Sequence, residues 1–524
     1  MDSNEPAALP NGKSDNGTSA DRNQQPTSQS ILHPDRIAKN TSYLTIALVI
    51  QKILSLGYFI YISRSVGPEN VGSYLTALAV TTVLGFFIDL NFSQATIREI
   101  AKRPEKTSDY INAALSVKTI TAILAYVVAQ LYVHVFHLPE IVQSLVLITG
   151  LVMVLDSLTL SFYSALRGHQ RLQYESIGTV ANKVLVTAIG VIGLSLGYSV
   201  HLLVLAILIG SIFNVFYSGA LVIKKLHWHL SLFSNLVDIR YLTRIVLPWF
   251  ALGGLFVTVY GYIDQVLLTN PLLVGDRGSS YLSWYGTAYK LTFSFQFLPA
   301  AVIAAFFPAM SHYFITDRER LRKTFVRAVS YLIIISVPLS LGIFSLADKI
   351  IVAAYTRVFA ASVIPLQILI ISLIFVFLNY PAGYLLYAAD RIRRNTIHVG
   401  IVMVVNILLN LLLIPGKTFI GAAIASSVSS VLLVVLNFSV VRQIIAFRLR
   451  PIFLVVGKAL LAAGSMAIGL WYLKEVMSVL VLIPLAVVWY FTILFLVKGF
   501  SVSDGMTVYR TVMRKVSPKN DHGA

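Results

Sequence analysis

The sequence contains no cysteine, and charged residues make up only 12% of its 524 residues. The absence of cysteine excludes disulfides, thiolate metal sites, iron–sulfur clusters and cysteine nucleophiles. Soluble domains usually carry about 25% charged and about 45–50% apolar residues, whereas 57% of this chain is hydrophobic. A soluble fold cannot hide that much apolar surface. The composition therefore excludes an ordinary soluble protein and indicates a membrane protein.

Acidic residues are also scarce, since 23 Asp and Glu stand against 41 Lys and Arg, which gives a formal charge of +18. In a soluble chain such an excess would suggest nucleic acid as a partner, but the position of the charges explains it here. Walker loops, Gly-rich dinucleotide turns, HExxH and His/Cys metal spacings are absent, and the connecting loops are short. We therefore expect no enzyme activity, no cofactor, no metal site and no nucleic-acid partner.

Long, unbroken apolar segments follow a polar beginning, and each is long enough to cross a bilayer as a helix. We predict an all-α polytopic membrane protein with about fourteen transmembrane helices. Their ranges are 41–62, 75–95, 113–135, 143–165, 176–197, 202–223, 245–269, 283–313, 326–347, 361–386, 397–414, 419–440, 452–473 and 477–497.

The positive charges predict the orientation of these helices. Of the 41 Lys and Arg, 31 fall in the two tails and in alternate connections, 6 fall in the other connections, and 4 lie within the spans. Because Lys and Arg accumulate on the cytoplasmic side of short loops, we predict that both termini are cytoplasmic. Residues 1–40 are rich in polar residues, Pro and Gly, and predict a disordered cytoplasmic tail. Residues 498–524 form a second cytoplasmic tail. We expect the chain to reside in the cell (cytoplasmic or inner) membrane.

Besides Arg327 and Lys458, which are counted above with the adjoining connections, seven charged residues lie within the predicted spans, where a charge at mid-bilayer costs about 2.5–3.5 kcal/mol on insertion scales. They are Lys52, Lys118, Lys183, Lys290, Asp89, Asp156 and Asp264. All seven belong to the first eight spans, so we expect the polar cavity there. Lys52 lies deepest and is the strongest candidate for a substrate contact, whereas Lys118 and Lys183 are near enough to the cytoplasmic face to extend to the headgroups instead.

An interior with more lysine than aspartate suits an anionic group such as phosphate. We predict a substrate-binding set of cavity cations, namely Lys52, Lys118, Lys183, Lys290 and, at the outer end of the first span, Arg64. Three carboxylates are candidates for ion coupling or for structural ion pairs, namely Asp89, Asp156 and Asp264. A pair between Asp264 and Lys290 is favoured, because both lie in the outer halves of neighbouring spans.

A series of short motifs extends along the chain from about residue 36 to 440. They comprise Asn40, Gly67-Pro68-Glu69, Gly72, Tyr74, Asp89-Leu90, Arg98-Glu99, Tyr285-Gly286, Ala288, Lys290, Pro299, Pro308, Ser311, Arg391, Asn406, Asn410, Pro415 and Gly421-Ala422-Ala423. This ordered set resembles the polysaccharide (lipid-linked oligosaccharide, O-antigen type) flippases of the multidrug/oligosaccharidyl-lipid/polysaccharide exporter superfamily. Asn91 departs from that family, which usually has Gly at this position.

The resemblance implies two six-helix lobes related by a pseudo-twofold axis, over 41–223 and 224–440, around a V-shaped cavity, with two additional helices within 441–497. It implies that the protein flips a lipid-pyrophosphate-linked oligosaccharide from the cytoplasmic to the outer leaflet by alternating access. Lysines would hold the pyrophosphate, and aspartates would couple an ion gradient if coupling exists. The expected partners are the lipid-linked glycan, membrane lipids, and the polymerase or glycosyltransferases that handle the glycan.

Three other functions remain open from the sequence. A lipid II (peptidoglycan precursor) flippase is the nearest alternative. A multidrug cation antiporter of the same superfamily normally has twelve spans, and its cargo would favour an acidic cavity. A non-transporting scaffold in envelope assembly would leave the intramembrane lysines dispensable.

Overall fold

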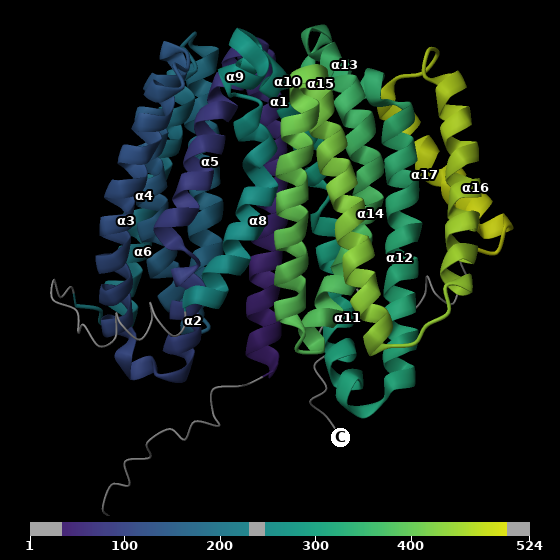
Figure 1. Ribbon diagram of the computed structural model, residues 1–524, viewed down its shortest axis with the longest axis horizontal. Coiled ribbons are helices and arrows are strands. Elements are labelled where there is room, and N and C mark those ends of the chain that lie inside the picture. The colour runs from purple at the N-terminus through teal and green to yellow at the C-terminus, as the bar shows by residue number, and fades with distance from the viewer. Residues whose placement is uncertain (1–33, 230–246, 500–524) are drawn as a thin grey trace, which may run out of the picture.

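The computed structural model describes residues 34–229 and 247–499, and nearly all of these residues are helical (Figure 1). The prediction of an all-α polytopic fold is confirmed for this part of the chain. The long apolar runs form helices because a helix satisfies every backbone N–H and C=O within its own segment, as a bilayer requires. The long helices stand side by side, and their ends form an upper and a lower edge in the view of Figure 1.

The helices within residues 34–229 are α1 (Pro34–Asp89), α2 (Phe92–Lys102), α3 (Thr107–Val135), α4 (Glu140–Gly168), α5 (Leu172–Ser195) and α6 (His201–Leu226). After that stretch come α8 (Leu247–Leu267), α9 (Pro271–Val274), α10 (Gly278–Ser294), α11 (Phe297–Thr316), α12 (Arg318–Ser345), α13 (Ala347–Tyr355), α14 (Val363–Ala388), α15 (Ile392–Ile444), α16 (Arg450–Leu473) and α17 (Val479–Leu496).

Two of the longest helices each contain a sharp reversal. In α1 the break is at Gly67, with φ 75° and ψ 172°, a left-handed conformation that glycine adopts at little cost. In α15 the break is at Thr418, with φ 49° and ψ −130°. Both breaks fall where the sequence predicted a short connection between two spans, so each long helix supplies two crossings.

The number of membrane crossings agrees with the sequence. Eleven helical stretches of the described chain are long and apolar enough to cross a membrane, and Ala251–Leu267 in α8 is a shorter apolar helix. With the stretches that contain Gly67 and Thr418 counted as two crossings each, the helices supply the fourteen crossings that the apolar runs predict.

Two details of the predicted boundaries are wrong. Residues 34–40 are helical, whereas the sequence analysis placed them in a disordered tail. Proline suits the first turn of a helix, and α1 begins at Pro34 and extends beyond its apolar run. The span predicted over 283–313 is two helices, α10 and α11, separated by Phe295 and Gln296. The predicted tails at residues 1–33 and 500–524 lie outside the described residues.

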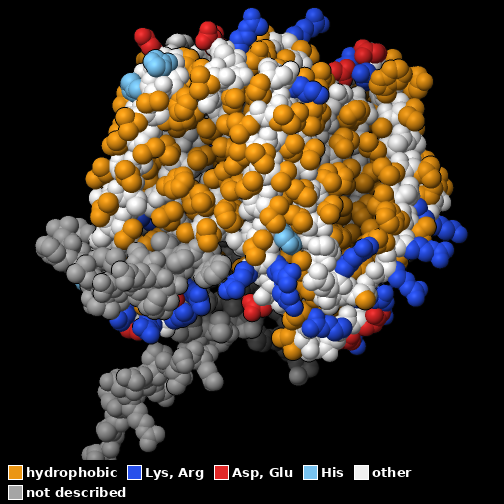
Figure 2. Space-filling model, in the orientation of Figure 1, with side chains coloured by type: hydrophobic (Ala, Val, Ile, Leu, Met, Phe, Trp, Pro, Cys, Tyr) orange, Lys and Arg blue, Asp and Glu red, His pale blue; other side chains and the backbone are white. Residues whose placement is uncertain are grey.

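The molecule has an apolar belt between two charged edges (Figure 2). Hydrophobic side chains cover the middle of the face, and Lys and Arg gather at the lower edge below α12, α15 and α16. Exposed apolar side chains such as Ile120, Phe216 and Leu412 belong to this belt. Exposing this apolar surface to water would cost free energy, whereas contact with hydrocarbon does not. The belt therefore marks the membrane-embedded zone.

Helix α1 lies at the centre of the packing. It packs against α3, α4 and α5 on one side and against α8 and α10 on the other. The second half of the chain packs through α14 on α15, α12 on α14, and α8 on α15. The last two helices pack on each other, and α16 also packs on α12. Contacts between α1 and α10 therefore join the first group of helices to the second.

Candidate functional site

A cavity of about 390 Å³ lies between both halves of α1 and the facing helices α8 and α10. Lys52 and Lys290 line it. The polar groups around them are Ser55, Thr82, Tyr262, Gln265, Tyr289, Ser294 and Gln296, and apolar residues of α1 complete the wall. No acidic side chain is among the described residues that line this cavity, so its fixed charge is positive.

Two lysines, Lys52 and Lys290, line this cavity, and Lys183 lies outside its lining but near enough to act on Lys290 electrostatically. Lys290 of α10 has Lys52 of α1 and Lys183 of α5 as its charged neighbours. Like charges repel strongly in a low-dielectric interior, and here no carboxylate stands between them. Such a cluster costs free energy while it is empty and favours an anion that bridges the ammonium groups.

Aromatic rings of α1 support these lysines. The Lys290 ammonium lies 4.0 Å from the centre of the Phe59 ring and 6.0 Å from that of Tyr74. The Lys183 ammonium lies 5.6 Å from the centre of the Tyr58 ring. The negative face of each ring partly offsets the cost of holding the cation out of bulk water.

The sequence analysis did not identify these rings as part of the site. A signal was present, because Phe59 follows Lys52 by seven positions and therefore lies on the same face of the helix, two turns away. The pairing of Phe59 with Lys290 depends on α10, which is far away in the sequence.

Lys118, which the sequence analysis grouped with the cavity lysines, lies elsewhere. Its ammonium is 2.5 Å from Asp89 Oδ1, and the side chain is 1% exposed. The ammonium also donates to Ser93 Oγ at 3.0 Å and to the Ser157 carbonyl at 3.2 Å. These partners satisfy the charge inside the protein, so Lys118 and Asp89 form a buried ion pair and Lys118 does not line the cavity.

Two other predicted residues also lie outside the cavity lining. Arg64 is exposed near the end of the first half of α1. Asp156 on α4 accepts a hydrogen bond from Ser211 Oγ of α6 at 2.7 Å. Its partner is a hydroxyl group, not a cation.

Asp264 does not pair with Lys290, and the predicted ion pair is wrong. Asp264 is 2% exposed, and its Oδ2 accepts hydrogen bonds from the hydroxyls of Tyr285 and Ser426. Five residues separate Tyr285 from Lys290, which places the two side chains about 140° apart around α10. Tyr285 therefore faces α8 and α15, whereas Lys290 faces α1.

The second oxygen of Asp264 is buried without a hydrogen-bond partner. A buried carboxylate with one unsatisfied oxygen is costly unless it takes up a proton or a cation. Nearby polar groups on the same helix pair include Tyr260 and Ser430, whose hydroxyls are 3.4 Å apart. Asp264 and the lysine cluster therefore form two separate polar sites.

These features define a polytopic membrane protein with a cationic cavity between its helices. Residues 37–314, more than half of the chain, match the polysaccharide biosynthesis protein family, and the chain belongs to that family. The resemblance found in the sequence is thus confirmed.

Relatives of known name or structure agree with this placement. The capsular polysaccharide biosynthesis protein CapF of Staphylococcus aureus is 22% identical over 403 residues, which cover 75% of this chain and 96% of CapF. The structure of the lipid II flippase MurJ in an inward closed conformation covers 90% of this chain and 99% of its own, with 15% identity and a TM-score of 0.70. An inward-facing multidrug resistance MATE family transporter covers 76% of this chain and 98% of its own, with 15% identity and a TM-score of 0.58.

Proposed function

We propose that this protein moves a lipid-pyrophosphate-linked oligosaccharide from the cytoplasmic to the outer leaflet of the cell membrane by alternating access. The observation that carries the proposal is the pair Lys52 and Lys290, with Lys183 as a further charged neighbour of Lys290, at a cavity whose described lining contains no carboxylate. A pyrophosphate carries negative charge that would compensate the positive charge of these lysines. Membership of the polysaccharide biosynthesis family supports a glycan on that pyrophosphate.

The cavity addresses the physical obstacle to this movement. A sugar headgroup cannot cross hydrocarbon unaided, because each polar group would lose its hydrogen bonds to water at a cost of several kcal/mol. The amides and hydroxyls of Gln265, Tyr262 and Tyr289 provide replacement partners beside the lysines. The isoprenoid tail has no such obstacle and stays in the bilayer.

Alternating access requires two lobes that move against each other, and we propose the lobes 41–223 and 224–440, with the segment 441–497 added outside them. The contact of α1 with α10 joins the lobes, and the lysines come from both, since Lys52 and Lys183 lie in the first and Lys290 in the second. An anion bridging them would draw the lobes together on binding.

We propose that the lower edge of Figure 1 faces the cytoplasm, because the inner side of a membrane protein accumulates Lys and Arg. The fourteen crossings then bring both termini to that side. The polymerase or glycosyltransferases that make and extend the glycan are the protein partners that this reaction requires.

The competing functions make different predictions about the cavity. An antiporter of organic cations needs an acidic site, which the described lining does not supply. A lipid II flippase handles the same pyrophosphate chemistry, so the lysines do not distinguish it from a polysaccharide flippase.

The test is a flipping assay with the purified full chain in vesicles, in which an added glycan-cleaving enzyme reports how much lipid-linked glycan has reached its side. Lys52→Ala and Lys290→Ala should each reduce flipping at least tenfold, and Lys52→Arg should retain part of it. Arg394→Ala, an exposed cation at the lower edge, is the matched control and should flip at the wild-type rate. Full activity in both alanine variants would refute the proposal, and preference for lipid II over other lipid-linked glycans would favour the alternative.

A further inference from the structure

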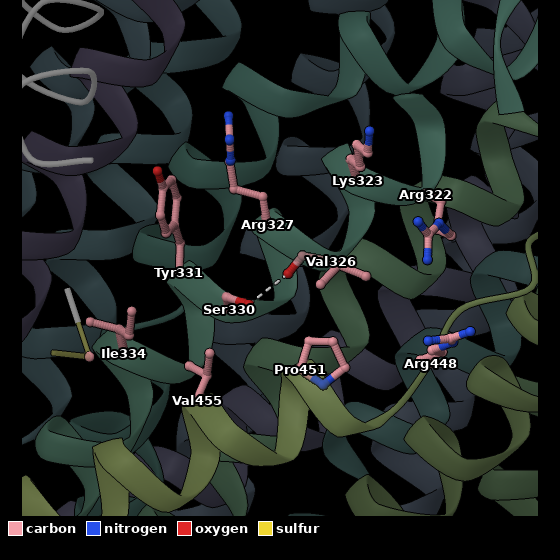
Figure 3. Close-up of a pocket in the computed structure, with 11 residues that line it drawn as sticks. Arg322, Lys323, Val326, Arg327, Ser330, Tyr331, Ile334, Arg448, Pro451 and Val455 are labelled. Carbon is pink, nitrogen blue, oxygen red and sulfur yellow. Dashed lines mark hydrogen bonds between the residues drawn. The ribbon is translucent and has the colours of Figure 1, made fainter. Parts of the chain in front are cut away.

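A second cationic pocket, of about 420 Å³, lies at the lower edge between α12 and α16 (Figure 3). Arg322, Lys323 and Arg327 reach it from the first turns of α12, and Arg448 reaches it from the segment just before α16. None of these four cations belongs to the cavity between α1 and α10. The proposed transport cycle therefore leaves this pocket unexplained.

The positive charge of the pocket is only partly compensated. Arg322 is bound to Glu319, and Lys323 lies 3.7 Å from the same carboxylate. Arg327 and Arg448 have no acidic partner within the described chain, and no Asp or Glu is among the described residues that line the pocket. Arg448 thus remains available for an anion, which the planar arginine fork binds in bidentate fashion. Arg322 lies at the same end of the pocket as Arg448, whereas Arg327 points away from both (Figure 3).

The pocket is amphipathic. Figure 3 shows Arg322 and Arg448 toward one end and Ile334 with Val455 toward the other. In the described chain, helix α16 packs mainly on α12 and α17, and its apolar side chains Phe453 and Leu461 are exposed. A ligand of this pocket therefore meets cations at the membrane edge and hydrocarbon further in.

The C-terminal residues of the chain do not match the charge of this pocket. Residues 500–524 carry four basic side chains, Arg510, Arg514, Lys515 and Lys519, against Asp504 and Asp521. A net positive segment would repel the guanidinium groups of Arg327 and Arg448. The ligand that fits must bring its own negative charge.

We infer that the pocket between α12 and α16 binds the anionic headgroup of a membrane phospholipid from the leaflet at the lower edge. Arg448 and Arg322, which lie at the same end of the pocket, hold the phosphate, and one acyl chain lies along Ile334 and Val455. Basic pockets between transmembrane helices on the cytoplasmic side commonly bind phospholipid headgroups in this way. A bound lipid would tie α16 to α12 and stabilise the folded protein by mass action.

The test measures lipid affinity of the full chain in detergent micelles containing phosphatidylglycerol or phosphatidylcholine with identical acyl chains. The readouts are the thermal unfolding midpoint and native mass spectrometry. The wild type should bind phosphatidylglycerol more tightly than phosphatidylcholine. The double variant Arg322→Gln, Arg448→Gln should lose about 30-fold in phosphatidylglycerol affinity, because each basic residue near an anionic lipid contributes about fivefold. Its affinity for phosphatidylcholine should not change.

The matched control removes the same charge outside the pocket with Arg320→Gln, Arg394→Gln, both exposed at the lower edge. An equal loss of affinity in this control would overturn the site in favour of a diffuse surface potential. A thermal shift produced equally by inorganic phosphate alone would overturn the lipid in favour of free phosphate. If the glutamine variant does not fold, the double variant Arg322→Lys, Arg448→Lys provides the test. It keeps the charge but loses the bidentate grip, so a severalfold loss supports the site and unchanged affinity overturns it.

Discussion

The Lys118 ammonium and the Asp89 carboxylate lie 2.5 Å apart and join α3 to the end of α1. The lysine is 1% exposed and the aspartate 14% exposed. Ser93 Oγ donates to the same carboxylate oxygen at 2.5 Å. Removing one partner of a buried, hydrogen-bonded ion pair leaves an uncompensated charge, whereas removing both partners does not.

Neutralising one partner of this pair should destabilise the protein. Lys118→Met or Asp89→Asn leaves a buried group without its partner, at a cost of about 3–5 kcal/mol, seen as less folded protein in the membrane. The double variant should recover much of that loss. The measurement is membrane abundance and resistance to thermal aggregation, analysed as a double-mutant cycle. Strictly additive losses would contradict the pairing.

Asp264 should behave differently, because its partners are hydroxyls. Asp264→Asn preserves the shape and an acceptor for Tyr285 and Ser426, so we expect normal abundance. If Asp264 carries the coupling ion, this variant should lose the response of flipping to an imposed proton or sodium gradient. Lys290→Ala should not reproduce that uncoupling, since the two residues are not paired. A large drop in the abundance of Asp264→Asn would instead assign the carboxylate a structural role.

The contact between Leu75 of α1 and Gly286 of α10 provides a test of lobe movement. A Cβ added at Gly286 would meet the Leu75 side chain, so cysteines at both positions are near disulfide range. The native chain has no cysteine, so the introduced pair reacts without competition. Oxidation of Leu75→Cys, Gly286→Cys should stop flipping, and a reductant should restore it. Each single-cysteine variant is the control, and flipping that continues in the fully cross-linked protein would argue against alternating access.

The hairpin at Thr418 depends on a close approach at Gly421. A Cβ there would lie 2.6 Å from the Leu413 carbonyl oxygen and 2.7 Å from its carbon. Because backbone atoms cannot move aside cheaply, Gly421→Ala should cost about 1–3 kcal/mol, measured as a lower unfolding midpoint. Gly416→Ala, whose Cβ meets nothing within 4 Å, is the matched control. Equal stability of the two variants would contradict the packing at this turn.

The unequal distribution of Lys and Arg between alternate connections predicts which side of the membrane each connection faces. Reporter fusions at residues 68, 276 and 417 should report the outer side, and fusions at 104, 320 and 392 the cytoplasm. In chain order the expected sides are outer, inner, outer, inner, inner and outer. A reversal at any two of them would contradict the fourteen crossings or their orientation.

The amino-acid sequence alone determined the fold class, the number of crossings and the places of the reversals at Gly67 and Thr418. Transfer of a segment into hydrocarbon depends on the composition of that segment, so it can be read locally. The cavity lysines Lys52 and Lys290, and their neighbour Lys183, could be proposed for the same reason, since each charge stands out within its own span.

The partners of these charges were decided only by the tertiary structure. Lys118 meets Asp89, Asp264 meets hydroxyls of α10 and α15, and Arg448 lies at the same end of a pocket as Arg322 of α12 (Figure 3). Which side chain a buried charge meets depends on how two helices, distant in the sequence, are rotated and spaced against each other. Span depth does not specify that rotation, which is why the predicted Asp264–Lys290 pair failed and the pocket between α12 and α16 was not foreseen.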